Sequence, residues 1–214
     1  ISLMGATLLS SAIQGFGNVG SHTARIMHES GMKVIAVSDV SGGIYNPRGL
    51  DIPKLLSTYK SAGQTLADTK LGDALTNAEL LQLKCTALVP AALSEQITEH
   101  NAAALNCRVL AEGANGPTTL EADRIIQDKG IFMIPDILAN SGGVIVSYFE
   151  WVQDAQRFFW KATDIQDRLC DLMTSAFQRT LHFATAKRTS MRMAALMTGI
   201  DKVAQAHLNR GLYP

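Results

Sequence analysis

The sequence predicts an α/β fold, a doubly wound and mostly parallel sheet that is followed by a C-terminal segment of helices. Three observations support this fold class. Short apolar runs alternate with helical periodicity as far as residue 135, which is typical of a parallel sheet with helices on both faces. A glycine-rich turn follows the first apolar run, and from Ile137 onward only helical patterns continue.

The glycine-rich turn lies in residues 12–20, with the sequence AIQGFGNVG. Gly15 suits a tight turn, Gly17 lets backbone approach a phosphate closely, and Gly20 lets a helix pack on the strand. The free N–H groups of that helix's first turn would face an anion. The spacing therefore predicts a Rossmann-like pyrophosphate site, and a tight turn without a ligand is the weaker alternative.

The elements around this turn follow from local patterns. We expect a first strand within residues 5–14, although Ser10 and Ser11 interrupt its apolar run and the strand could begin only at Ala12. The next helix should bury one face, formed by Val19, Thr23, Ile26 and Met27. A second strand covers residues 33–38 and ends at Asp39, about twenty residues after the glycines, as a dinucleotide-binding fingerprint requires.

The middle of the chain continues the alternation. Turn residues predict a surface loop after Asp39, then a helix over 52–60 and an irregular stretch over 63–73. The TNAE motif at 76–79 predicts a capping box that opens a short helix through Leu83. Further strands are predicted at 87–90, 108–111 and 131–135, with helices at 97–105 and 119–129.

The last third predicts three helices, one through about residue 154, one from 164 past 181, and one over 191–208. The third carries an apolar stripe of Ile200, Val203, Ala204 and Leu208, and Gly211 and Pro214 fit its end. We interpret residues 1–140 as a dinucleotide-binding domain and 141–214 as helices that pack on it.

Composition excludes several classes of protein. The 214 residues hold 19 basic and 19 acidic side chains, so no broad basic field points to nucleic acid. Cys85, Cys107 and Cys170 fit reduced thiols, and no histidine pair has metal-helix spacing. With no apolar run of membrane-spanning length and no charged leader, we expect a cytoplasmic protein without metal. The chain does not begin with Met, which suggests an excised or processed piece.

Five motifs in order resemble the glutamate, leucine, phenylalanine and valine dehydrogenase family, and glutamate dehydrogenase above all. They are QGFGNVG at 14–20, SD at 38–39 with SGGIY at 41–45, PAAL at 90–93, EGANGPTT at 112–119 and PDILANSGGV at 135–144. The ending RGLYP at 210–214 also resembles the family's C-terminus. The resemblance implies the C-terminal nucleotide-binding domain of an enzyme that reversibly deaminates L-glutamate to 2-oxoglutarate and ammonium with NAD or NADP.

The same resemblance implies roles for individual residues. The pyrophosphate would lie on Gly15, Phe16, Gly17, Asn18 and Val19. Ser38 and Asp39 would meet the adenosine ribose, where a carboxylate accepts hydroxyl hydrogens and repels a 2'-phosphate; this favours NAD, with dual use as the alternative. Ala91 and Ala92 would flank the adenosine, and Asn115 and Asn140 would hold the nicotinamide ribose and carboxamide. Val144 would line the substrate pocket, and Ser147 would bind the side-chain carboxylate of glutamate.

The family's catalytic lysine and aspartate belong to an N-terminal substrate domain, and their motifs do not occur in these 214 residues. We therefore expect a chain that binds dinucleotide without turning over glutamate, and no catalytic residue of its own. The alternatives are a free-standing nucleotide-binding module or inactive partner, and a leucine- or phenylalanine-type dehydrogenase, against which Ser147 argues. Relatives form homohexamers, and the C-terminal helices would face the missing domain.

Overall fold

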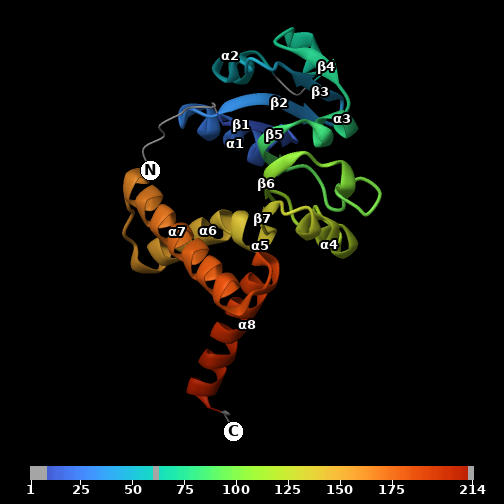
Figure 1. Ribbon diagram of the computed structural model, residues 1–214. Helices are drawn as coiled ribbons and strands as arrows, with labels where there is room; N and C mark the ends of the chain where they lie inside the picture. Colours follow the sequence, from blue (N-terminus) through green and yellow to red (C-terminus); the bar gives the residue numbers. More distant parts are fainter. Residues whose placement is uncertain (1–8, 60–62, 212–214) are drawn as a thin grey trace. The chain divides into compact units, whose positions relative to one another are not determined.

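The computed structural model describes residues 9–59 and 63–211. It divides into two compact units, residues 1–133 and 134–214 (Figure 1). Among the described residues, the first unit has two buried hydrophobic clusters and the second has one. The parts of three predictions lie outside the described residues: the start of the first strand, the end of the helix over 52–60, and the ending at 212–214.

The first unit is built on a seven-stranded sheet in the order β4-β3-β2-β1-β5-β6-β7. The strands are β1 (Ser10–Gln14), β2 (Lys33–Asp39), β3 (Gly42–Tyr45), β4 (Asp73–Leu75), β5 (Cys85–Pro90), β6 (Cys107–Ala111) and β7 (Phe132–Ile134). β1 pairs in parallel with β2 and β5, and β5 with β6, whereas β3 and β4 add an antiparallel edge. The predicted mostly parallel sheet is confirmed.

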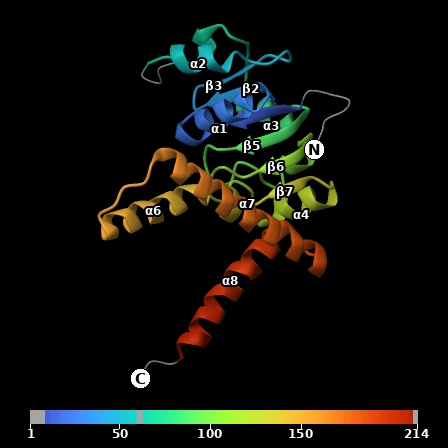
Figure 2. The same cartoon turned by 90° about the vertical axis from the view of Figure 1, so that its left-hand side faces the viewer.

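Helices cover both faces of this sheet, as the alternation predicts (Figure 2). They are α1 (Asn18–Glu29), α2 (Ile52–Thr58), α3 (Asn77–Gln82) and α4 (Leu120–Asp128). Neighbouring residues of β1 point into different cores, Ile13 into the one with α1 and α2, and Ala12 into the one with α3 and α4. A strand buried on both faces needs a continuous apolar run, which β1 has only from Ala12.

The serines at the start of β1 do not stop the strand. Ser10 and Thr86 exchange hydrogen bonds, the Ser10 amide to the Thr86 hydroxyl at 3.2 Å and the Thr86 amide to the Ser10 hydroxyl at 3.3 Å. The pairing with β2 shifts register between Ser11 and Ala12. The strand therefore begins before Ala12, and its irregularity lies where the sequence departs from an apolar run.

The predicted loop after Asp39 was wrong where β3 forms, and β4 begins at Asp73, the last residue of the predicted irregular stretch. The strand signal is weak because two of the four β3 residues are glycines, which have low β-propensity. Gly43 packs so closely that a Cβ there would lie 2.7 Å from the Val37 carbonyl oxygen, and Ile44 is fully buried. This edge is held by tertiary packing that no local pattern records.

The helix predicted over 97–105 was also wrong. The segment forms a single bridge between Ile97 and Thr118 and a 3-10 turn at Ala102–Ala104. The Asn101 side chain accepts the Thr98 amide hydrogen at 2.9 Å and donates to the Gln96 carbonyl at 2.9 Å. Such side-chain bonds to backbone compete with helix formation.

The start signals of the other helices were correct, and the predicted buried face of α1 was right only in part: Met27 packs against the core and Thr23 is half-buried. Thr76 and Glu79 form the predicted capping box of α3, and Thr119 caps α4. In α1 the buried residues are Gly20 and Ala24, while Val19 and Ile26 are half exposed. Small residues bring this helix close to the sheet, so large apolar side chains alone do not locate the centre of its buried face.

The second unit consists of α5 (Asp136–Ala139), α6 (Gly142–Gln156), α7 (Ala162–Lys187) and α8 (Met191–Arg210). Leu138, Ala184, Met191 and Ala194 form its core, and Asp136 pairs with Arg192 at 3.4 Å. The predicted apolar stripe lies on α8, but Ile200, Val203 and Leu208 are 66–72% exposed. No helix within residues 9–59 and 63–211 has the length and apolarity to cross a membrane.

Candidate functional site

The predicted glycine turn is a close-packed junction of three segments. Gly15 has φ +93°, and a Cβ there would lie 2.6 Å from the Ala91 carbonyl oxygen, just after β5. A Cβ on Gly20 would lie 1.8 Å from the Gly15 carbonyl oxygen. Both positions require glycine, the first for its backbone conformation and both for the close approach. Their spacing is thus explained by the fold before any ligand is considered.

Gly17 is different, because the fold does not require it. Its φ of −76° suits any residue, and a Cβ there would meet nothing within 4 Å. It precedes α1, which has neither a side-chain cap nor an acidic residue in its first turn. The first helical bond runs from Ser21 to the Gly17 carbonyl at 2.9 Å, so the amides of residues 18–20 precede the hydrogen-bonded ladder. This end of α1 suits an anion that approaches the backbone.

The side chains between these glycines point in different directions. Phe16 is buried, and its ring centroid lies 5.8 Å from that of Tyr59. Asn18 and Val19 are exposed on the first turn of α1. Phe16 therefore anchors the turn in the core, whereas Asn18 and Val19 are available at the surface.

Asp39, at the carboxyl end of β2, is already engaged by protein donors. Its Oδ1 accepts the Ser41 amide hydrogen at 2.8 Å and the Ser41 hydroxyl at 2.6 Å. Its Oδ2 accepts the Tyr59 hydroxyl. The sequence located the carboxylate, but nothing in it identified Tyr59 as a partner, because α2 and the end of β2 meet only in the fold.

Ser38 lies behind Asp39 and is fully buried. Its hydroxyl donates to the Asn77 side-chain oxygen at 2.6 Å, and the Asn77 amide donates to the Asp39 carbonyl at 3.1 Å. Asn77 thus ties the first residue of α3 to the end of β2 and fixes where the Asp39 carboxylate emerges. Sequence reasoning missed Asn77, which it treated only as part of a capping motif.

The remaining site residues of the first unit follow β5 and β6. Ala91 is half-buried, and its amide donates to the Gln14 carbonyl at 2.7 Å, while Ala92 and Asn115 are exposed. Gly113 lies against Ala91, where an added Cβ would be 3.1 Å from the Ala91 methyl carbon. Because β1, β2, β5 and β6 are parallel, the predicted residues of this unit gather at one edge of the sheet, where α/β folds bind ligands.

Three predicted residues belong to the second unit. Asn140 is half-buried directly after α5, and its backbone N–H donates to the Asp136 carbonyl at 2.9 Å. Val144 and Ser147 are exposed on α6, one turn apart and so on one side of that helix. The exposed side of α6 thus carries Val144 and Ser147, and Asn140 lies between α5 and α6.

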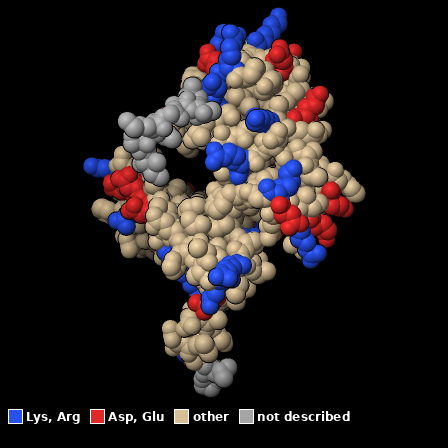
Figure 3. Space-filling view, in the orientation of Figure 1, with Lys and Arg blue, Asp and Glu red and all other residues tan. Residues whose placement is uncertain are grey.

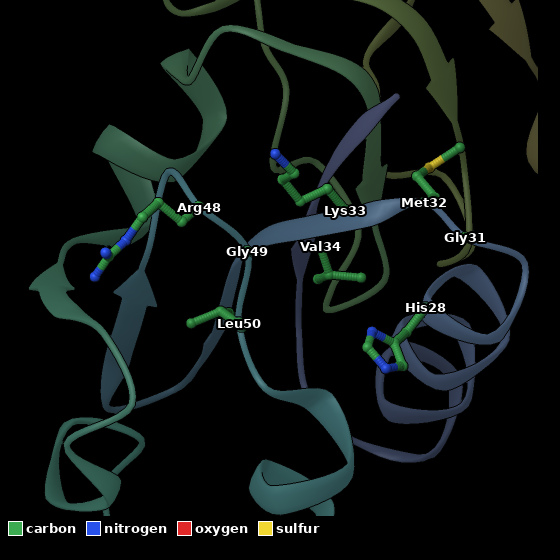
Figure 4. A pocket seen from close by; sticks show the side chains of 8 residues that line it. All are labelled: His28, Gly31, Met32, Lys33, Val34, Arg48, Gly49 and Leu50. Carbon is green, nitrogen blue, oxygen red and sulfur yellow. The ribbon is translucent and has the colours of Figure 1, made fainter. Parts of the chain in front are cut away.

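The first unit also has a hollow of about 250 Å³ at the opposite end of β2, lined by His28, Lys33 and Arg48 with five uncharged residues. Figure 4 shows that these basic side chains extend in different directions and do not converge on one point. The hollow lies at the amino end of the strand, away from Asp39. We therefore do not assign it to the dinucleotide.

Charged side chains of both signs occur in this chain, and two of its three thiols are buried. On the face in Figure 3, basic and acidic side chains are interspersed. Burial raises the pKa of Cys85 to about 12 and that of Cys107 to about 11, so both thiols stay protonated. In the part of the chain that the structure describes, no group of three or more His, Cys, Asp or Glu side chains could hold a metal ion.

Comparison with known proteins gives one consistent answer. Residues 4–211 match the family model described as Glutamate/Leucine/Phenylalanine/Valine dehydrogenase. The chain is 46% identical over 212 residues to the cryptic catabolic NAD-specific glutamate dehydrogenase of Bacillus subtilis, covering 99% of this chain and 48% of that protein. It is 48% identical over 204 residues to the glutamate dehydrogenase of Thermotoga maritima, covering 95% of this chain and 49% of that protein.

Solved structures agree. The hetero-hexameric glutamate dehydrogenase of Thermus thermophilus in its leucine-bound form matches with a TM-score of 0.88 and 31% identity, over 96% of this chain and 48% of that one. The glutamate dehydrogenase of Peptoniphilus asaccharolyticus matches with a TM-score of 0.79 and 34% identity, over 95% of this chain and 47% of that one. The chain spans about half the length of the relatives that it matches.

Proposed function

The chain belongs to the glutamate/leucine/phenylalanine/valine dehydrogenase family, and from this membership we propose that it binds NAD as the nucleotide-binding domain of a glutamate dehydrogenase. The parent enzyme would reversibly deaminate L-glutamate to 2-oxoglutarate and ammonium. The chemistry that the dinucleotide supplies when bound is the acceptance of a hydride. This chain's residues would hold and orient it.

The observation that carries the proposal is the open backbone at Gly17. The fold explains Gly15 and Gly20, but a Cβ at Gly17 would meet no protein atom within 4 Å. A ligand that needs this space would account for the glycine at position 17. The backbone amides of Asn18 and Val19 precede the first helical hydrogen bond and lie at the positive end of the α1 dipole, so they suit a pyrophosphate there.

The other residues at this edge have complementary chemistry. Asp39 would accept a ribose hydroxyl, and its charge favours NAD over NADP, with dual use as the alternative. Ala91 and Ala92 would leave room for the adenosine, and Ser38 would act through Asn77, because its own hydroxyl is buried.

The nicotinamide end would be held by Asn115 and Asn140, whose amides offer both a donor and an acceptor. On α6, Val144 would line the substrate pocket and Ser147 would donate to the side-chain carboxylate of glutamate. A branched-chain or aromatic substrate has no carboxylate at that point, so Ser147 favours glutamate over leucine or phenylalanine as substrate.

We expect this chain alone to bind dinucleotide without turnover, because it lacks the family's lysine and aspartate motifs. Exposed apolar side chains on the second unit fit a surface that faces a substrate domain. They include Tyr148 and Trp151 on α6, which are 58% and 66% exposed. The parent is proposed to be a cytoplasmic homohexamer; one structural relative, from Thermus thermophilus, is a hetero-hexamer.

Calorimetric titration of the chain with NAD and with NADP tests the proposal. Saturable binding of NAD, tighter than that of NADP, is the expected result. A chain that binds neither nucleotide would contradict it. The second candidate, a nucleotide-binding module without chemistry, is distinguished by the full open reading frame: an upstream lysine motif supports the enzyme, and its absence supports the module.

A further inference from the structure

The Asp39 carboxylate, which we propose to meet the ribose, already accepts hydrogen bonds from other residues of the chain. A carboxylate has about four lone-pair positions for hydrogen bonds. Three are occupied on Asp39, two on Oδ1 by Ser41 and one on Oδ2 by the Tyr59 hydroxyl. A ribose diol that donates two hydrogen bonds to this group would have to displace a protein donor.

We propose that Tyr59 sets the nucleotide selectivity of this site by competing with the ribose for Asp39, so that the site discriminates against a 2'-phosphate only weakly. The inference rests on the proposed dinucleotide function and deepens it. The Tyr59 hydroxyl points its positive dipole end at the carboxylate and so weakens the repulsion of a phosphate, and it occupies the oxygen that a ribose hydroxyl would use.

The surroundings hold Tyr59 in this position. Tyr59 directly follows the last turn of α2, and its backbone amide donates to the Leu55 carbonyl at 2.9 Å. Its ring packs against Phe16 of the glycine turn. Leu55 is fully buried. The partly buried tyrosine therefore lies between the glycine turn and the Asp39 carboxylate and contacts both.

The test is the ratio of the dissociation constants of NADP and NAD, measured by calorimetry for the chain and for Tyr59→Phe. This change removes one hydroxyl and keeps the ring that packs on Phe16. We expect the ratio to rise about tenfold or more, as befits the loss of one hydrogen bond to a charged group. NAD binding should strengthen, and NADP binding should weaken.

Two further variants sharpen the result. Tyr45→Phe removes a hydroxyl from another half-buried tyrosine of the same unit, on β3, and should leave the ratio unchanged. Ser41→Ala removes one of the two donors to Oδ1 and should move the ratio in the same direction as Tyr59→Phe, but less.

The outcomes separate the two proposals. If the unsubstituted chain binds nucleotide and the ratio in Tyr59→Phe stays within twofold of it, about 0.4 kcal/mol, the selectivity role of Tyr59 is wrong and the proposed function stands. A ratio that falls has the same meaning. If the unsubstituted chain binds neither NAD nor NADP, both proposals fail together.

Discussion

Gly17→Ala tests ligand binding without disturbing the fold, because a Cβ at this position would meet no protein atom within 4 Å. The substitution gains about 0.4–1 kcal/mol by restricting the unfolded chain. It loses about 0.5 kcal/mol because alanine is a poorer N-cap than glycine. The free energy of unfolding should therefore change by less than about 1 kcal/mol.

Nucleotide affinity should respond quite differently to the same methyl group. It would project into the space that we assign to the pyrophosphate and hold the phosphates off the amides of α1. We expect NAD to bind at least about tenfold more weakly, a loss of about 1.4 kcal/mol. Urea unfolding and calorimetric titration of the same preparation measure the two quantities.

Gly20→Ala is the matched control. Its Cβ would start 1.8 Å from the Gly15 carbonyl oxygen, so the helix must move. We expect a loss of stability of about 1–3 kcal/mol or more from overpacking. If Gly17→Ala bound NAD as tightly as the original chain, the pyrophosphate would not lie against Gly17 and our reasoning would be refuted. A loss of stability equal to that of Gly20→Ala would refute the claim that Gly17 is open.

Three other predictions concern stability. Thr76→Ala removes the acceptor for the Glu79 amide and should lower the free energy of unfolding by about 1 kcal/mol in urea melts; an unchanged value would mean that the capping box contributes nothing. Arg192→Met removes the ion-pair partner that lies 3.4 Å from Asp136, where both side chains are only 15–16% exposed. The free energy of unfolding should fall by about 2 kcal/mol in the same assay. The control Arg179→Met, at an exposed position, should leave it nearly unchanged. Burial raises the pKa of Cys85 to about 12 and of Cys107 to about 11, so the unfolded chain releases these protons first, near its thiol pKa of about 8.5. Stability should be intact below that pH and fall as pH rises toward the folded pKa values; Cys85→Ala should show a smaller fall between pH 8 and 10, and equal falls would contradict the assignment.

The elements that the sequence located are those with a local signal. β1, β2, β5 and β6 follow short apolar runs, and the capping motif placed α3. The antiparallel edge was missed because the glycines of β3 carry no strand signal and are held by the packing of Gly43 against Val37. The helix expected over 97–105 failed because Asn101 bonds to backbone that a helix would use.

The site divides along the same line. Glycine spacing and an acidic residue at a strand end are visible in one dimension, so Gly15, Gly17 and Asp39 could be named from the sequence. Their partners Asn77 and Tyr59 approach only when α3 and α2 pack on the sheet. The sequence therefore identifies the groups that a ligand would contact, and the fold adds the residues that position them.

The contact of Gly15 with Ala91 joins two strands that are distant in the chain. The junction that this contact completes does not exist in an isolated β1-α1 peptide, and it arises only when β5 has paired with β1. A dinucleotide bound there, as we propose, would select the folded chain, and at a hundred times its dissociation constant it would add about 2.7 kcal/mol to folding stability. The supply of coenzyme in a cell would then govern how long such a domain survives proteolysis.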